Sequence, residues 1–150
     1  MPAIRKIGYS ETFSKLNTLS AANGETNDCA VKAVALVTGK LYDEAHRALA
    51  AKGRVARKGT YRHQQFDVIR EFGKTLTRID PREIIKQYPS PHRDVLKSVT
   101  THHPRRFNKV WPKGTYLLFS VGHVSAVIDG VLHDWAVNSA RRVTEIYEVK

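Results

Sequence analysis

The stretch from residue 29 to residue 38 constrains the fold most strongly, because it reads as a helix that is apolar on nearly all sides. Asn27 and Asp28, both good N-cap residues, precede it, and Gly39 follows it as a typical helix-ending residue. A helix without a polar face must be enclosed by the rest of the chain. We therefore expect a buried helix over about 29–39, with the only cysteine, Cys29, at its N-terminus.

Two further helices are predicted in the first half of the chain. One follows a helical repeat of apolar residues from residue 41 to 49 and closes at Gly53, and the other begins after Thr60 and ends at Gly73. The apolar positions that define the second of them are Phe66, Ile69 and Phe72. The first 25 residues show no clear period, so we expect an extended arm there, and a short helix is predicted at 84–87.

The last third of the chain changes to the short, β-branched and aromatic runs that are typical of strands. These runs cover residues 115–120, 123–128, 131–135 and 143–149, with one earlier extended piece at 76–79. Helices first and strands last indicate an α+β fold, in which N-terminal helices pack on a C-terminal antiparallel sheet. A length of 150 residues predicts one domain that spans residues 1–150.

An Asp129-Gly130 pair marks a two-residue hairpin turn between two of these strands. With this turn, Ile128 pairs with Val131, and the same register continues outward along both strands. His123 and Asp134 then lie on one face of the hairpin as diagonal neighbours.

This placement suits an imidazole that a carboxylate holds in one tautomer. Asn138 lies on the same face of the hairpin and is the alternative orienting residue for His123. The competing interpretation is an ordinary strand histidine whose hydrogen bonds are satisfied.

Cys29 has a position that favours the reactive form of its side chain. At a helix N-terminus, the unpaired backbone N–H groups and the positive end of the helix dipole stabilise a thiolate. The alternative is a small buried core residue, since free cysteines are often buried.

The stretch from Asn27 to Gly39 resembles the nucleophile helix of papain-like cysteine peptidases, and its Asp-Cys-Ala start is closest to the bacteriocin-processing leader peptidases. A late strand that opens with histidine, followed by Asp or Asn, is similar to the rest of that superfamily's triad. The resemblance implies a papain-like fold and a cysteine hydrolase, peptidase or acyltransferase with Cys29 as nucleophile, His123 as base and Asp134 as orienting residue. It covers residues 23–39 and 115–138.

The resemblance also implies a role for the residue six positions before the cysteine, which in the family is usually a glutamine that donates to the oxyanion. This chain has Asn23 there, followed by Gly24. Asn23 is shorter by one methylene, and we expect it to act as the oxyanion donor beside the backbone amide of Cys29. The substrate would be a protein or peptide, or another amide.

The charge balance points to a second class of function. The chain has 25 Lys and Arg against 14 Asp and Glu, a net charge of +11, which attracts polyanions. The alternative to an enzyme is therefore an inactive papain-like fold whose basic surface binds an acidic protein or nucleic acid. Aromatic and basic groups come together at Tyr61, Arg62 and His63, while the simpler interpretation of the charge is a solvated surface.

Other site classes and the compartment follow from what the sequence lacks. We expect no cofactor, since there is no phosphate-binding glycine loop and the seven histidines, including His102, His103 and His133, lack the spacing of a zinc site. With one cysteine, no apolar run long enough to span a membrane and no secretory signal, a cytoplasmic protein is expected. Small basic proteins of this build resemble some that bacteriophages encode, in which case the compartment is the host cytoplasm.

Overall fold

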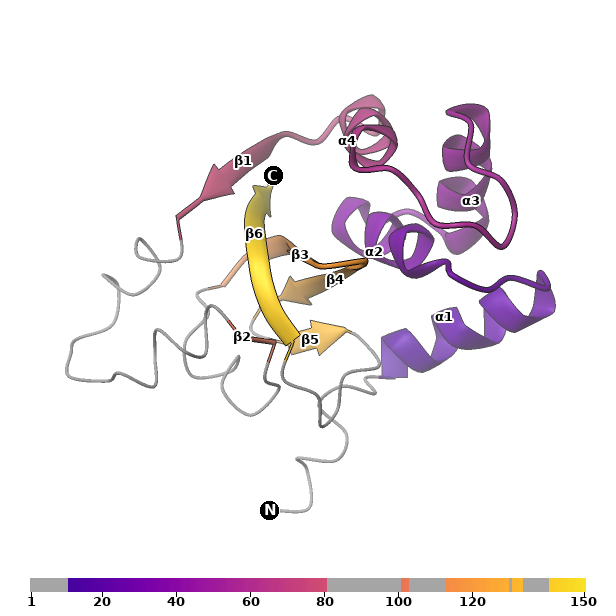
Figure 1. The fold of residues 1–150 in the computed structure, drawn as a ribbon, viewed down its shortest axis with the longest axis horizontal. Helices are drawn as coiled ribbons and strands as arrows, with labels where there is room; N and C mark the ends of the chain where they lie inside the picture. Colours follow the sequence, from indigo (N-terminus) through magenta and orange to yellow (C-terminus); the bar gives the residue numbers. More distant parts are fainter. Residues whose placement is uncertain (1–10, 81–100, 103–112, 130, 134–140) are drawn as a thin grey trace, which may run out of the picture.

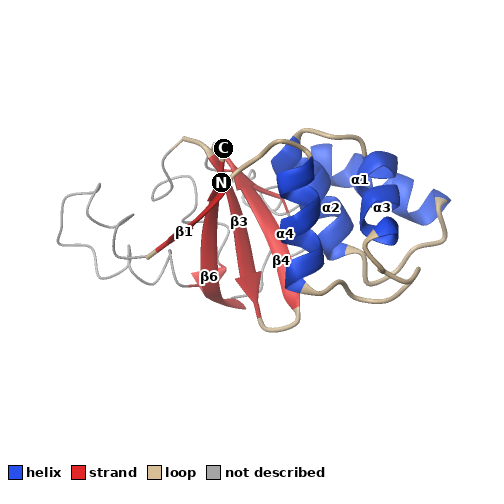
Figure 2. Ribbon diagram, turned by 90° about the horizontal axis from the view of Figure 1, so that it is seen from above, coloured by secondary structure: helices blue, strands red, loops and turns tan. Residues whose placement is uncertain are grey.

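The computed structural model describes residues 11–80, 101–102, 113–129, 131–133 and 141–150. Within these ranges four helices come first and the strands of one antiparallel sheet come mostly last, so the expected α+β class is confirmed (Figure 1). The helices gather on one side of the sheet, where α2 packs against β4 and β3 (Figure 2). None of the described helices is long and apolar enough to cross a membrane.

The helices are α1 (Glu11–Ala22), α2 (Cys29–Thr38), α3 (Tyr42–Ala51) and α4 (Arg62–Glu71). The predictions of α2, α3 and α4 are confirmed. The cap of α4 lies one residue later than expected, at Tyr61, whose N–H donates to Oε1 of Gln64 over 2.9 Å. The expected helix at 84–87 falls outside the described residues.

Helix α2 lies at the centre of the core, as its all-round apolar sequence requires. Val31 and Val34 are fully buried, and the core around them also includes residues of α3, α4 and the sheet. Gly39 ends the helix in the left-handed conformation with φ 69°, and the N–H of Lys40 donates to the carbonyl oxygen of Ala35 over 3.1 Å. This termination follows the usual pattern in which a glycine closes the last turn.

The expectation of an extended arm before residue 25 is wrong for residues 11–22, which form α1. Phe13, Leu16 and Ser20 are its buried residues, at the three- and four-residue spacing of one helix face. Only two of these three are apolar, and the neighbouring Leu19 is exposed. The apolar repeat was therefore too weak to recognise without the surface that it packs on.

The strands are β1 (Leu76–Ile79), β2 (Thr101–His102), β3 (Thr115–Ser120), β4 (His123–Ile128), β5 (Val131–His133) and β6 (Arg141–Val149). The sheet order is β1-β6-β3-β4-β5, and β2 pairs with β6. The four C-terminal strands were expected, whereas β2 was not. Val124 and Ala126 of β4 belong to the core shared with α2, which places this end of the sheet against that helix.

The predicted hairpin register is confirmed for the described residues of β4 and β5. Ile128 pairs with Val131, and Ala126 pairs with His133. Asp129 has φ 50°, the positive value that a tight hairpin turn of this kind requires. An aspartate adopts this conformation more readily than most residues do.

Candidate active site

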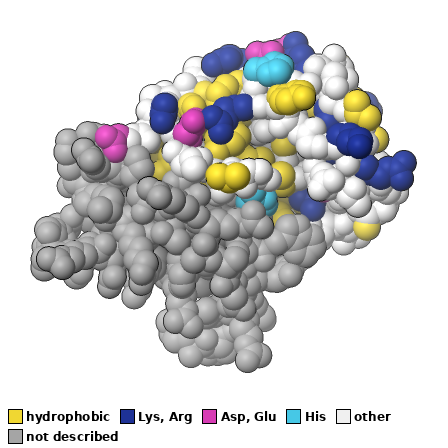
Figure 3. Space-filling view, viewed as in Figure 1, with side chains coloured by type: hydrophobic (Ala, Val, Ile, Leu, Met, Phe, Trp, Pro, Cys, Tyr) yellow, Lys and Arg dark blue, Asp and Glu magenta, His cyan; other side chains and the backbone are white. Residues whose placement is uncertain are grey.

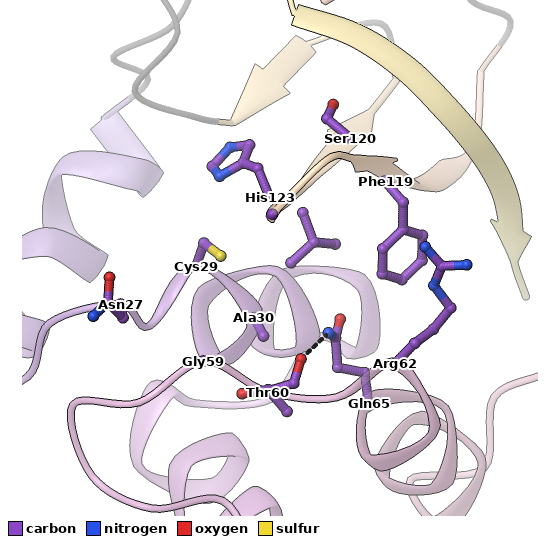
Figure 4. A pocket seen from close by; sticks show the side chains of 12 residues that line it. Asn27, Cys29, Ala30, Gly59, Thr60, Arg62, Gln65, Phe119, Ser120 and His123 are labelled. Carbon is purple, nitrogen blue, oxygen red and sulfur yellow. Dashed lines mark hydrogen bonds between the residues drawn. The ribbon is translucent and has the colours of Figure 1, made fainter.

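Cys29 and His123 line one cavity between the helices and the sheet (Figure 4). The cavity has a volume of about 410 Å³, which is large enough for part of a peptide or a small molecule. Cys29 is the first residue of α2 and His123 is the first residue of β4, so the packing of α2 on β4 brings the two together. Cys29 is partly exposed.

The N-terminus of α2 is left open by the residue that could have capped it. Asp28 is buried and its side chain makes no cap hydrogen bond. Instead, its carboxylate accepts a hydrogen bond of 2.7 Å from the Tyr42 hydroxyl and lies 3.4 Å from Nζ of the buried Lys32. The Asp28 side chain therefore does not compete for the N–H groups of the first turn, where a thiolate or an oxyanion would bind.

The Tyr42 hydroxyl is kept neutral by its surroundings. Burial raises the pKa of Tyr42 well above its usual value, and the hydrogen bond to Asp28 raises it further. Tyr42 is therefore a donor to Asp28 at every physiological pH. This fixed contact ties the residue before Cys29 to α3.

A β-bulge lies beside His123 in the sheet. Ser120 pairs with His123 on one side, and on the other side the pairing of β3 with β6 shifts between Phe119 and Ser120. Thr144 falls in this shift, and its hydroxyl donates to the carbonyl oxygen of Phe119 over 3.0 Å. Bulges increase the local twist and redirect side chains, and they are common next to active sites.

His123 and Val124 have an unusual placement at the start of β4. By strict alternation, His123 would lie on the opposite sheet face from Val124, yet both line the cavity with Cys29.

The two candidates for orienting His123, Asp134 and Asn138, lie outside the described residues. The register of β4 and β5 is confirmed as far as His133, so the hairpin argument for Asp134 stays a prediction.

Asn23, the expected oxyanion donor, is not among the residues that line this cavity. Because α1 continues to Ala22, Asn23 closes that helix, with its N–H bonded to the carbonyl oxygens of Leu19 and Ser20. Its side-chain Nδ2 donates to the Leu19 carbonyl oxygen over 2.8 Å and lies 3.5 Å from Asp43 Oδ1. The Asn23 side chain therefore bonds at the end of α1 and is not among the groups that line the cavity.

A buried carboxylate that the sequence did not reveal holds the loop before Cys29. Glu25 accepts two hydrogen bonds from Arg54, at 2.8 and 3.2 Å, one of 2.7 Å from the N–H of Arg57 and one from His46. The hydrogen bonds from Arg54 are the largest cause that lowers the pKa of Glu25, and those from His46 and the Arg57 N–H lower it further. Burial acts in the opposite direction, and the resulting pKa is about 2. Asn27 adds a bond of 3.2 Å from Nδ2 to the Arg57 carbonyl oxygen.

Asn27 and Arg57 both have positive φ, at 53° and 65°, although neither is a glycine. Such strained residues persist only where the surroundings fix them, and they cluster at functional sites. The two loops on this side of the cavity are therefore held in one shape by each other.

The far side of the cavity is formed by α4 and the loop before it. Gln65 is buried and its Nε2 donates to the Thr60 carbonyl oxygen over 3.3 Å (Figure 4). Arg62 lies with its guanidinium 4.4 Å from the centre of the Phe119 ring and 2.6 Å from Glu145 Oε1. These residues come together only in the folded chain, and nothing in their sequence spacing indicated it.

No described group of three His, Cys, Asp or Glu side chains is arranged to hold a metal ion. Comparison of the chain with models of known protein families, with curated proteins and with solved structures finds no match.

Proposed function

We propose that this protein is a papain-like cysteine hydrolase that acts on an amide bond, with Cys29 as nucleophile and His123 as general base. One observation carries the proposal: the thiol at the open N-terminus of α2 and the imidazole at the start of β4 line the same cavity. Nucleophilic catalysis by cysteine requires these two groups in one site, with the thiol activated by its base and its surroundings.

The reaction follows from these positions. His123 accepts the proton of the Cys29 thiol, and the thiolate attacks the carbonyl carbon of the substrate. The N–H groups at the start of α2 stabilise the oxyanion, and the departing amine takes the proton from His123. A water molecule then gives up a proton to His123 and attacks the thioester, which releases the acid and restores the thiol. Asp134, or Asn138, would hold the His123 ring during both steps.

A direct test is alkylation of Cys29 by iodoacetamide. A free thiol has a pKa of about 8.5, so at pH about 6.5 the folded protein should react at least about tenfold faster than the protein in urea. His123→Ala should remove most of this advantage, whereas His63→Ala, an exposed histidine that does not line the cavity, should retain it. Equal rates for folded and unfolded protein would refute the proposal.

A second candidate is an inactive relative of such enzymes that binds an acidic protein or nucleic acid. The net charge of +11 favours it, as does the placement of Asn23 away from the cavity. In this case Cys29 would react no faster than a free thiol, and its replacement by alanine would leave binding unchanged. The alkylation experiment therefore separates the two functions.

A further inference from the structure

A second hollow adjoins the catalytic cavity and shares two residues with it. Its volume is about 500 Å³, and Gly59 and Thr60 line both hollows. Val55 and Tyr61, which line the second hollow only, expose 62% and 73% of their surface. A ligand that leaves the cavity past Gly59 and Thr60 therefore meets an aliphatic and an aromatic side chain.

Lys58 lines this hollow, and Arg57 precedes it in the loop between α3 and α4. The segment from residue 52 to 62 has five basic side chains, but three of them are paired with carboxylates. These pairs are Lys52 with Glu71, Arg54 with Glu25, and Arg62 with Glu145. No ion pair is found for the other two, Arg57 and Lys58, within the described part of the chain, and both are exposed.

The loop that carries these cations is held in shape without any ligand. The N–H of Arg57 donates to Glu25, its carbonyl oxygen accepts from Asn27, and the N–H of Lys58 donates to the Val55 carbonyl oxygen over 3.0 Å. A backbone that is already fixed loses little conformational entropy when a partner binds. The strained φ of Arg57 is consistent with a loop shape that is kept for function.

We propose that this second hollow binds an extended peptide segment with apolar and acidic side chains, next to the bond that Cys29 attacks. The inference rests on the proposed function and names the substrate class. An apolar side chain packs on Val55 and Tyr61, while a carboxylate meets Lys58. The continuity at Gly59 and Thr60 places this segment on one side of the scissile amide.

A peptide fits the hollow better than a nucleic acid does. Nucleic-acid surfaces present a row of cations for successive phosphates, and their affinity depends on the number of these contacts. Of the described cations that line this hollow, Arg54 is paired with Glu25 and only Lys58 is in no ion pair. The Tyr61 ring already stacks on His63, with ring centres 5.7 Å apart at 14°. An exposed valine beside the tyrosine suits an aliphatic side chain of a peptide.

The test measures peptide binding to the 150-residue chain with Cys29→Ala, in which no bond can be cleaved. The probes are a fluorescein-labelled peptide of alternating leucine and glutamate and its counterpart with glutamine in place of glutamate, followed by fluorescence anisotropy. In this background Lys58→Glu should weaken binding of the acidic peptide about fivefold, and Tyr61→Ala about tenfold. Lys150→Glu changes the net charge equally at a position that lines neither hollow, and it should have less than about a twofold effect.

Equal affinity for the two peptides would overturn the inference, and so would an equal loss of peptide affinity in Lys58→Glu and Lys150→Glu. It would also be overturned if single-stranded oligothymidylate of equal charge displaced the acidic peptide at a lower concentration than the unlabelled peptide does. Thermal unfolding of each variant confirms that it is folded. Peptide binding needs no active thiol, so the binding experiment and the Cys29 alkylation test are independent. A failure of the alkylation test refutes catalysis but not peptide binding.

Discussion

Glu25 shows how single residues hold the site together from a distance. It lies four positions before Cys29 and is buried among hydrogen-bond donors from α3 and from the loop that follows it. A buried carboxylate is stable only when such donors compensate for its lost hydration. The charge of Glu25 thus fixes the loop that leads into α2.

The pKa of Glu25 makes this contribution dependent on pH. Its folded value of about 2 lies below its ordinary value of 4.5, so the folded state is stabilised above pH 4.5 and loses this stabilisation as the pH falls toward 2. A shift of this size corresponds to about 3 kcal/mol. In urea unfolding, Glu25→Gln should be less stable than the unchanged protein at pH 7, and the difference should shrink between pH 4.5 and 2.

Glu71→Gln serves as the control, because the Glu71 carboxylate pairs with Lys52 in a half-exposed position. This variant should follow the unchanged protein across the same pH range. A stability difference for Glu25→Gln that stays constant with pH would contradict the role of its charge.

Asp28 and Lys32 form a buried ion pair one helical turn apart at the start of α2. Removing one partner of a buried pair leaves a charge that burial destabilises, so Lys32→Met should cost about 3 kcal/mol. Asp28→Asn with Lys32→Met should cost less than the sum of the single changes, with a coupling energy of about 1–3 kcal/mol from urea unfolding.

The chain offers a matched control for this measurement. Glu11 and Lys15 have the same spacing in α1, at 3.6 Å, but their side chains are mostly exposed. Their coupling should not exceed about 0.5 kcal/mol. If both pairs gave the same coupling, burial would not be what strengthens the first.

At the scale of elements, the glycine that ends α2 sets the length of that helix. Gly39 has φ 69°, and a Cβ at this position would meet no atom within 4 Å, so a substitution is opposed by backbone strain alone. Gly39→Ala should lower the free energy of unfolding by about 1 kcal/mol. Gly59→Ala has equal space and no positive φ, and its unfolding should be unchanged. Similar losses for both would exclude the left-handed conformation as the cause.

The elements with strong local signals could be predicted from the sequence. Helix α2 was marked by its apolar run and by Gly39, and the register of β4 and β5 by Asp129. Helix α1 was missed because its buried face holds only Phe13, Leu16 and Ser20, and these become a signal only where another surface covers them.

Part of the site was predictable because two of its residues lie in elements with strong local signals. Cys29 and His123 stand at the starts of well-marked elements, so their placement followed from the fold. The contacts of Glu25 join residues about 20 to 30 positions apart, and such contacts produce no repeating pattern in the sequence. Asn23 was assigned from the resemblance alone, and the unforeseen length of α1 moved it away from the cavity.

On the scale of the whole molecule, the site depends on the packing of two layers. The helical layer supplies Cys29 and the sheet supplies His123, and the contact of α2 with β4 is what joins them (Figure 2). The cluster of Phe66, Phe119 and Tyr147 fixes α4 to the same sheet, with ring centres 4.9 to 5.8 Å apart. The Tyr147 hydroxyl donates to Glu145 over 2.6 Å and lowers the pKa of that carboxyl, which also pairs with Arg62 of α4.

The net charge of +11 also belongs to the whole molecule rather than to one site. On the face shown in Figure 3, Lys and Arg side chains lie at several separate places, some of them next to acidic side chains. Charges further apart than the Debye length of about 8–10 Å act almost independently in physiological salt. Attraction to a polyanion should therefore be a sum over many weak contacts.

Binding to heparin should respond to the same substitutions differently from binding to the acidic peptide. The protein should bind to a heparin column and elute at moderate salt, because every contact is lost as counterions compete for it. Lys58→Glu and Lys150→Glu each remove two units of positive charge, so each should lower the eluting salt concentration by a similar amount, although only the first should weaken binding of the acidic peptide. If only Lys58→Glu lowered the eluting salt concentration, polyanions would bind at the hollow beside Tyr61. The basic loop would then be a nucleic-acid site rather than part of a peptide groove.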